Sequence, residues 1–425
     1  MKHFVFVLGS YHPNYSAVGI CVKNIVDEIS QRNKVSVVCF KNSYAQLDEQ
    51  IIDNNKTYRV SSKINTLKIK IEYLLKSSNR FKKILYVSIL TLIRLYRYID
   101  AIASKENFQK DIVNAFLYKL SELNQNEEID VVVPCSFPVE SVLASAEFCE
   151  KNDKIMIPYL FDNYLESNKL HRLNWNKKIK YKNHIELLRV VFSQSKHILA
   201  MHSLKRSFVN NYSNFSTKIT YVEHPLLKKI DKITQKWDEI EDSISNLTYT
   251  GSFLKNHVEP NYFFKLFSFK KNIDFKINLY TRGDCDDLIN AFTSSNPKKN
   301  INHGSVSFET ALSAIVNSDF LISVAEISGK QVSSKIFTYM SAGKPIIHFY
   351  TNEEDINKHI LKNYPLSLCV KQDLNLLEDN VLIVNDFIKK TKGEYIVFEE
   401  LSNIYFEALP SYTSNILEKL SYDIQ

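Results

Sequence analysis

Residues 328–347 constrain the fold of this chain most, because they join a polar loop, a short amphipathic helix and an apolar strand with almost no linker between them. Ser333 or Ser334 is expected to cap the helix, and Gly343 to stop it before the strand. The apolar residues between these two signals have the i, i+3, i+4 spacing of one helix face: Ile336, Tyr339 and Met340. A helix that ends directly before a buried strand is typical of an α/β sheet.

The start of this helix has the features of an anion site. Ser334, Lys335 and Thr338 share the face opposite the apolar one. A helix start presents unpaired N–H groups and the positive end of a dipole, and a lysine there opposes that dipole unless an anion is present. The segment therefore indicates a site for a diphosphate. The alternative is an amphipathic helix with a solvated lysine.

The length of 425 residues suits two domains of roughly 200 residues each. The pattern of apolar strands restarts after Pro225, which we expect near a hinge. We place the first domain at 1–222, the second at 223–404 and a last helical segment at 405–425. In the first half a helix is expected near 20–31, between buried strands that indicate a parallel sheet: 3–8, 34–40, 129–134, 154–161, 197–201 and 219–222.

Glycine is rare and marks strand ends in the second half of the chain. Of eight glycines, Gly251, Gly283 and Gly304 each follow a run that predicts a strand, namely 246–250, 275–282 and 301–303. Arg282 lies directly before the second of them. Ligands of open α/β sheets collect outside the carboxyl ends of the strands, so these ends are candidate site positions.

Six cysteines form no Cys-x-x-Cys pair and lie mostly in apolar runs. Residues 3–8 pass into a pattern that continues as a fold, so we expect them to be the first strand and not a signal peptide. We therefore expect reduced core cysteines in a cytosolic protein, with neither disulfides nor zinc.

Positive charge is concentrated in residues 56–110, which hold 13 lysines and arginines against three acids, a net charge of +10 compared with +7 for the whole chain. Its uninterrupted apolar part, about ten residues, is far shorter than the roughly 20 needed to span a bilayer. A basic amphipathic segment on an anionic membrane surface is one interpretation. Packing within the first domain is another. Binding to nucleic acid is disfavoured, because no nucleic-acid motif accompanies the segment.

Residues 334–347, Ser-Lys-Ile-Phe-Thr-Tyr-Met-Ser-Ala-Gly-Lys-Pro-Ile-Ile, resemble the signature of GT-B glycosyltransferases, especially the family 4-like enzymes of bacterial surface polysaccharide assembly. The resemblance runs almost continuously over 249–347 and more loosely through the first half. It departs from the family at Ser333, which stands for Pro, and at Thr338, which stands for the Glu that holds the nucleotide ribose. A threonine can still bond a ribose hydroxyl, without the strength of a charged acceptor.

This resemblance implies an α/β fold of two Rossmann-like domains that face each other across a cleft, with the final helix returning to the first domain. It implies a nucleotide-sugar site in the second domain, where Lys335 and Lys255 would stabilise the leaving diphosphate. Ser252 stands where relatives have an Arg, and Lys255 would cover that charge from a shifted position. The donor-binding residues would be Gly251, Ser252, Arg282, Gly304, Ser305, Val306, Ser334, Lys335 and Thr338.

On the acceptor side, the first loop, with His12, Ser16 and Gly19, matches the place of the family's Gly-rich loop. Asp162 follows a predicted strand and would orient or deprotonate an acceptor hydroxyl, unless it is a cap or turn residue. His202 and His224 would face the cleft in such a fold, although each alone has the alternative of a structural role.

Together these features predict a metal-independent glycosyltransferase that needs no cofactor, and the resemblance alone implies that it retains the anomeric configuration. It would transfer a sugar from a nucleotide diphosphate to a saccharide or lipid-linked saccharide, in the cytoplasm or at the inner face of the membrane. Asp284 and Asp286 have the letters of a metal pair without supporting context. A nucleotide-sugar 2-epimerase and a catalytically silent scaffold subunit of the same fold are the alternatives.

Overall fold

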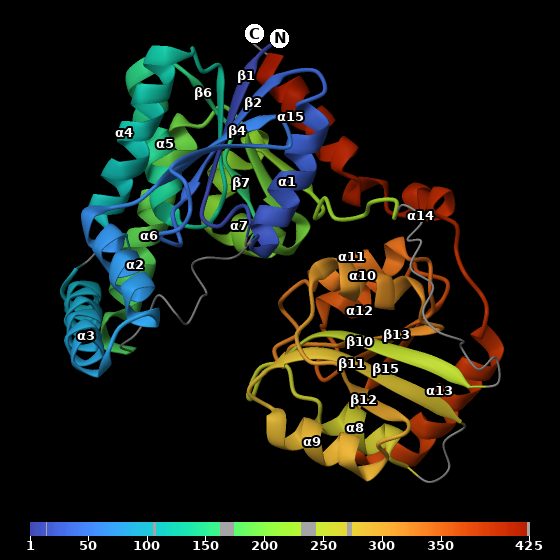
Figure 1. Ribbon diagram of the computed structural model, residues 1–425. Coiled ribbons are helices and arrows are strands. Elements are labelled where there is room, and N and C mark those ends of the chain that lie inside the picture. Colours follow the sequence, from blue (N-terminus) through green and yellow to red (C-terminus); the bar gives the residue numbers. More distant parts are fainter. Residues whose placement is uncertain (14, 105–107, 162–173, 231–243, 270–273, 423–425) are drawn as a thin grey trace. The chain divides into compact units, whose positions relative to one another are not determined.

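The computed structural model describes residues 1–13, 15–104, 108–161, 174–230, 244–269 and 274–422, and of residues 174–176 only the backbone (Figure 1). The chain forms two compact units. Unit 1 comprises Met1–Pro225 and Pro410–Gln425, and unit 2 comprises Leu226–Leu409. Each is described by itself.

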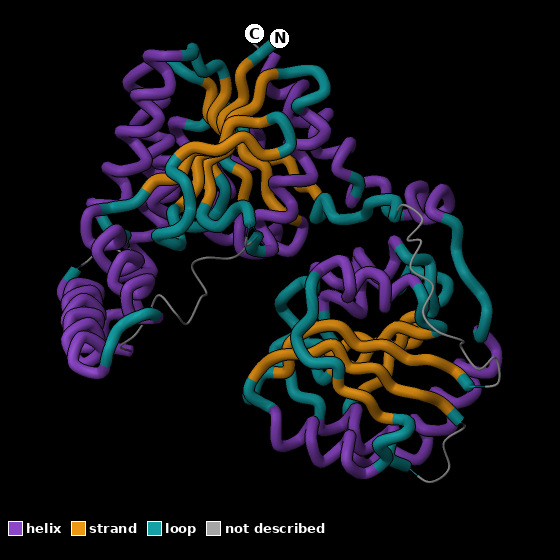
Figure 2. Tube along the Cα trace, viewed as in Figure 1, coloured by secondary structure: helices purple, strands orange, loops and turns teal. Residues whose placement is uncertain are grey.

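Unit 1 is built on a six-stranded sheet in the order β3-β4-β2-β1-β5-β6, in which only the β3–β4 pair is antiparallel. Figure 2 shows the strands of unit 1 in orange with helices around them. The central strand β1 (His3–Leu8) is buried along its whole length, as its apolar sequence predicts. The other strands are β2 (Lys34–Phe40), β3 (Glu49–Ile52), β4 (Asn55–Val60), β5 (Val131–Pro134) and β6 (Ile155–Met156).

The β3–β4 hairpin corrects the expected extent of the basic amphipathic segment. Residues 56–60 belong to a strand of the sheet, so the amphipathic part begins later. Asp53 and Asn54 form the turn with φ of 47° and 65°, the left-handed conformation that two-residue hairpin loops favour. Two of the counted cations are engaged here: Lys56 pairs with Glu127, and the buried Arg59 donates to backbone carbonyls.

A second sheet of three parallel strands, in the order β7-β8-β9, completes unit 1. The single strand expected at 154–161 is divided in two, β6 and β7 (Tyr159–Leu160), and the division falls at Pro158. Proline cannot donate to a ladder, and at this point the chain passes from pairing with β5 to pairing with β8 (Ile198–Met201). The third strand is β9 (Ile219–Val222).

The helices of unit 1 include the expected terminal one, α15 (Pro410–Tyr422), which packs on α1 (Ala17–Ile29). Arg32 forms an ion pair with Glu418 across this contact at 2.8 Å. Helix α1 begins three residues before its predicted start, because Ser16 caps it. The remaining helices are α2 (Lys63–Lys76), α3 (Arg80–Ala103), α4 (Lys110–Asn126), α5 (Val139–Asn152), α6 (Asn174–Gln194), α7 (Lys205–Tyr212) and the short η2 (His202–Leu204) and η3 (Ser213–Lys218).

Unit 2 contains one sheet of six parallel strands in the order β12-β11-β10-β13-β14-β15. The order reverses at β10, so the sheet is doubly wound. Strands β10 (Ser245–Phe253), β11 (Phe275–Gly283), β12 (Asn300–Asn302) and β14 (Ile346–Tyr350) match strands predicted from the sequence. Strands β13 (Phe320–Val324) and β15 (Ser367–Lys371) complete the sheet.

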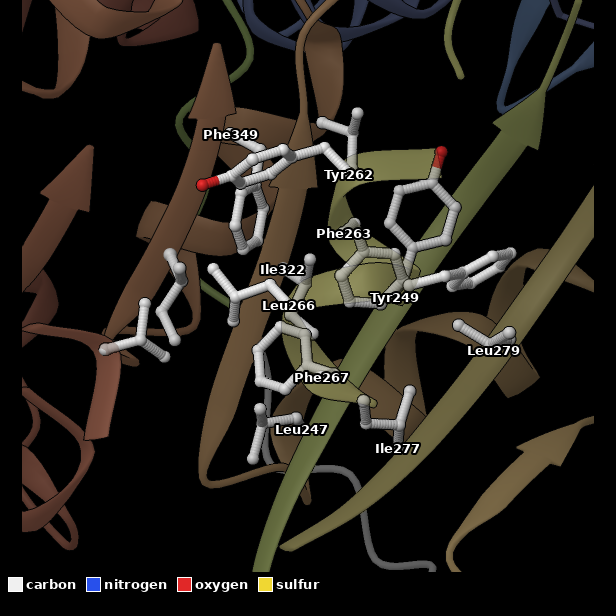
Figure 3. Close-up of a cluster of buried hydrophobic side chains, with 14 of the residues drawn as sticks. Leu247, Tyr249, Tyr262, Phe263, Leu266, Phe267, Ile277, Leu279, Ile322 and Phe349 are labelled. Carbon is white, nitrogen blue, oxygen red and sulfur yellow. The ribbon is translucent and has the colours of Figure 1, made fainter. Parts of the chain in front are cut away.

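Helices cover both faces of this sheet (Figure 1). One face carries α8 (Asn261–Phe267), α9 (Asp286–Ser295) and α13 (Leu377–Thr391), over a core rich in phenylalanine and tyrosine (Figure 3). The other carries α10 (Phe308–Val316), α11 (Ser334–Ser341) and α12 (Ile356–Leu361). The short η4 (Leu374–Leu376) precedes α13, and α14 (Phe398–Ile404) and η5 (Phe406–Ala408) follow it. All six cysteines are free.

Candidate functional site

The glycines that were predicted to mark strand ends lie at the carboxyl edge of the unit 2 sheet. Gly251 and Ser252 end β10 and pair in register with Thr281 and Arg282 of β11. Gly304 follows β12, the next strand along. The sheet therefore brings these donor-site candidates to one edge, beside the start of α11.

Helix α11 is fixed to β10 by a tyrosine. The hydroxyl of the buried Tyr339 accepts from Thr250 N at 3.0 Å and lies 3.0 Å from Thr250 Oγ1. Because Tyr339 lies one turn after Lys335, this contact sets where the start of the helix meets the strand. The sequence marked Tyr339 as a core residue and gave no sign of this bond.

Lys335 crosses β10 at Gly251. A Cβ built on Gly251 would collide with Lys335 Nζ and lie 2.9 Å from Cε, so only glycine leaves room for the lysine. The ammonium lies 5.9 Å from the ring centroid of Tyr249, whose hydroxyl bonds the carbonyl of Ser252. Glycine at 251 is therefore a steric requirement of the lysine position, in addition to its φ of +153°.

The ammonium of Lys335 lacks a carboxylate partner among the residues that the structure describes. Burial, together with the nearby positive charge of Arg282, lowers the pKa of Lys335 to about 8. Arg282 itself is exposed, and its Nε lies 3.4 Å from Ser252 Oγ. Two cations held close together without a neutralising acid are suited to bind an anion with more than one charge.

The backbone at the start of α11 adds donors to the same place. Ser333 occupies the N-cap position, but its side chain accepts no capping bond; its own N–H donates to Asn357 Oδ1 at 2.7 Å. Within the described chain, the N–H groups of Ser334 and Lys335 have no acceptor. Unpaired N–H groups and the positive end of the helix dipole at a helix start favour an anion.

The loop before α11 is organised by Glu326, which the sequence did not single out. Its carboxylate accepts from the backbone N–H groups of Ser328 and Lys330 at 2.8 Å each and of Gln331 at 3.2 Å. Burial alone would raise the pKa of Glu326, but the hydrogen bond from the Ser328 hydroxyl and those from the backbone N–H groups outweigh burial and lower the pKa. A glutamate directly after a buried strand at the carboxyl edge was the available signal.

The remaining donor candidates lie beside this centre. Thr338 is half-buried on α11, one turn after Lys335. Gly304 has a φ of +69° and open space where a Cβ would project, Ser305 is exposed, and Val306 is half-buried. Next to them the His303 ring stacks on Tyr280, with centroids 4.3 Å apart.

Two predicted residues have other surroundings. The side chain of Lys255 is exposed, and its backbone N–H donates to Asp284 Oδ1 at 2.8 Å. Asp286 begins α9. Across the described residues, no three His, Cys, Asp or Glu side chains gather as metal ligands.

In unit 1, two of the three predicted loop residues have local structural roles. Ser16 accepts from Gly19 N at 3.0 Å as the cap of α1, and a Cβ on Gly19 would collide with the carbonyl of Ser10. The carbonyl of His12 accepts from Arg59. Asp162 lies outside the described residues.

The carboxyl ends of β8 and β9 bring a second group of titratable residues together in unit 1. Glu223 Oε1 accepts from His224 N at 2.8 Å and lies 2.7 Å from His224 Nδ1. Burial would raise the pKa of Glu223, but its bonds with His224 and the charge of His202 lower it overall. A carboxylate on Nδ1 orients the imidazole and fixes its tautomer. Glu223 was not among the predicted site residues.

A cavity of about 320 Å³ in unit 2 lies apart from the Lys335 cluster. Tyr262 on α8 and the residues after β13, β14 and β15 (Ala325, Thr351 and Gln372) line it. It contains none of the predicted donor residues.

No protein-family model matches the chain. No curated protein matches it either. Solved structures do. A lipopolysaccharide outer core galactosyltransferase, WaaB, is 12% identical with a TM-score of 0.57 and full coverage of both chains. A sucrose-phosphate synthase from Thermosynechococcus elongatus is 10% identical, TM-score 0.63, and a UDP-GlcNAc 2-epimerase from Neisseria meningitidis, bound to UDP-GlcNAc, is 11% identical, TM-score 0.54, each with 99% coverage of both chains. At these identities the likeness concerns the fold, and the chain has the GT-B fold.

Proposed function

We propose that this protein is a glycosyltransferase that moves a sugar from a nucleoside-diphosphate donor to a saccharide or lipid-linked saccharide acceptor during bacterial surface polysaccharide synthesis. One observation carries the proposal. The ammonium of Lys335, from the start of α11, lies against Gly251 of β10 and near Arg282, and it has no carboxylate partner in the described chain. The GT-B fold and the nucleotide sugar bound to one structural neighbour support it.

The chemistry follows from charge. When the bond between sugar and diphosphate breaks, the diphosphate gains negative charge, and fixed positive groups stabilise that charge more than they stabilise the intact donor. Lys335, Arg282 and the N–H groups of Ser334 and Lys335 would supply this stabilisation without metal. Thr338 would bond a ribose hydroxyl, and the loop of Gly304, Ser305 and Val306 would contact the base. The proposal includes retention of the anomeric configuration, and the sequence resemblance alone supports this part.

The acceptor side of the proposal rests on unit 1. Asp162 and His12 remain the candidates from the sequence, and the Glu223–His224 pair joins them because an oriented imidazole can bond or deprotonate an acceptor hydroxyl. A lipid-linked acceptor requires the enzyme to work at a membrane surface, which in this proposal is the anionic inner face of the cell membrane.

Thermal unfolding with UDP, GDP, dTDP, CDP and ADP tests the donor site, with Lys335→Ala alongside. A ligand at 100 times its dissociation constant adds about 2.7 kcal/mol of stability, which is a readily measured shift. We expect a selective response to one base that the variant loses. If no diphosphate stabilises the wild-type protein, the donor site is refuted.

The two alternatives give different results in the next experiment. With the matching nucleotide sugar, an epimerase would interconvert the free donor without any acceptor. A silent scaffold subunit would bind the nucleotide and neither transfer nor epimerise the sugar. Transfer that depends on an added saccharide supports the proposal.

A further inference from the structure

Helix α3 presents an apolar face to solvent. It packs with α2 as a hairpin that extends from the sheet of unit 1, and Leu90 is its only residue that is fully buried (Figure 1). On the side opposite Leu90, six large apolar residues fall within about 100° of arc at 100° per residue. All of them are more than half exposed: Phe81 (85%), Ile84 (63%), Leu85 (57%), Leu92 (63%), Leu95 (51%) and Ile99 (55%).

Cations border this stripe on both sides. At 100° per residue, Arg80 lies about 40° beyond one edge of the stripe and Lys82 about 60° beyond the other. Arg94 and Lys83 are also exposed but lie farther round the helix, about 80° and 100° beyond the first edge. These four cations form no ion pair with any residue that the structure describes. By contrast, Arg97 points to the packed side and bonds both carboxylate oxygens of Asp111. All four cations are therefore available to an external anion, and Arg80 and Lys82 flank the stripe.

The positive charge of the α2–α3 hairpin limits which partner can cover the apolar stripe of α3. Residues 63–103 contain nine lysines and arginines and two acids, a net charge of +7 that equals the net charge of the whole chain. A second copy of α3 laid on the first would bring like-charged borders together, which disfavours self-association. The described chain contains no helix long and apolar enough to cross a membrane. A lipid bilayer with an apolar interior and anionic headgroups fits both the apolar stripe and the positive charge of the hairpin.

We propose that α3 docks unit 1 on an anionic lipid bilayer, lying in the plane of the interface with Phe81, Leu85, Leu92 and their neighbours in the acyl boundary and the bordering cations at the phosphates. This proposal assigns the membrane contact of the proposed function to one face of α3. It rests on the proposed function only for the reason why the protein would bind a membrane. It does not extend to all of residues 56–110, because the strand β4 and the cations paired in the sheet take no part.

The experiment is flotation of the full chain with vesicles of phosphatidylcholine alone and of phosphatidylcholine mixed with phosphatidylglycerol. The wild-type protein should float with the anionic vesicles and much less with the neutral ones, and added salt should weaken binding. The double variant Leu85→Asp/Leu92→Asp should bind on the order of tenfold more weakly or worse, because two exposed leucines no longer enter the bilayer.

A matched control is available on α13 of unit 2, where Leu382 and Ile383 are 59% and 49% exposed. Leu382→Asp/Ile383→Asp adds the same charge to another exposed helix and should leave binding unchanged. Arg80→Glu/Lys82→Glu should lose the preference for anionic lipid, with Lys362→Glu/Lys389→Glu as its control. Thermal unfolding of each variant checks that the fold is intact.

Three outcomes would overturn the proposal: wild-type protein that floats with neither vesicle, α3 variants that float as well as their controls, or a dimer in sedimentation that the leucine variants abolish. The nucleotide response separates this proposal from the function. Lys335→Ala should still bind vesicles, and the α3 variants should still be stabilised by the nucleotide. Loss of one property without the other therefore shows which of the two proposals has failed.

Discussion

The ammonium of Lys335 occupies the space into which a side chain at residue 251 would project. The strand and the helix that carry these two residues are joined by the bonds of Tyr339 to Thr250. A glycine in β10 and a lysine in α11 are therefore one structural feature, although 84 residues separate them in the sequence. Either residue can be changed to test it.

Gly251→Ala should displace the lysine without unfolding unit 2, because the atoms in its way are the end of a flexible side chain. We expect nucleotide affinity to fall on the order of tenfold, the cost of about one hydrogen bond to a charged group. Isothermal titration with the preferred diphosphate measures it. Gly393→Ala is the control, since Gly393 also has a positive φ, of +82°, with nothing near its Cβ position. Equal losses in both variants would mean that backbone strain is the cause.

Lys335→Met should stabilise the ligand-free protein while abolishing its nucleotide response. The folded-state pKa of Lys335, about 8, lies below the ordinary value of 10.5, so folding disfavours the charged form. This cost is fully present below pH 8, amounts to up to about 3 kcal/mol and disappears as the pH rises to 10.5. Urea unfolding of both proteins across that range measures it. If the variant is less stable than the wild type at pH 7, the charged form of Lys335 does not destabilise the folded protein.

Nucleotide affinity should fall as the pH rises through 8, because the free protein then loses the charge on Lys335 that the diphosphate requires. The slope approaches tenfold per pH unit once the lysine is mostly neutral. Titrations between about pH 7.5 and 9.5 avoid the ionisation of the phosphate itself. Lys335→Arg keeps its charge throughout, so its affinity should be flat over the same range. A wild-type profile as flat as that of the arginine variant would rule out titration of Lys335.

Tyr339→Phe should lower both stability and nucleotide affinity. The change removes the hydroxyl that accepts from Thr250 N and leaves that buried N–H without an acceptor, at a cost of about 1 to 3 kcal/mol. It also frees the start of α11 to shift against β10. Urea unfolding and nucleotide titration measure the two effects. Tyr364→Phe, which removes the bond of another buried tyrosine to Lys344 O, should reduce stability with a smaller loss of affinity.

The sequence predicted β10, β11 and β12 of unit 2 well because each is a short run that ends at or near a glycine. It missed the β3–β4 hairpin, where charged residues such as Lys56 and Arg59 obscure the alternation of a sheet edge. It also joined β6 to β7, because periodicity cannot show a strand that changes sheets at Pro158. Both misses concern partners of a strand, which depend on residues far away in the chain.

The same limit applies to the candidate site. Lys335 and Gly251 were each predicted from local signals, a helix start and a strand end. Their steric relation, the bond of Tyr339 to Thr250 and the carboxylate of Glu326 under its loop all join segments that only the folded sheet brings together. Ser16 and Gly19 show the converse, since a loop-to-helix pattern also arises when a residue merely caps a helix.

Thr338→Glu should increase nucleotide affinity. The threonine lies on the site face of α11, one turn after Lys335, where the resemblance to GT-B glycosyltransferases places a ribose-binding glutamate. A carboxylate accepts from a ribose hydroxyl about twice as strongly as a neutral oxygen, so we expect a gain on the order of tenfold in titrations at pH 7. The gain should require the ribose, so inorganic pyrophosphate is the control ligand and its affinity should not rise. Weaker nucleotide binding in the variant would place the ribose elsewhere than beside residue 338.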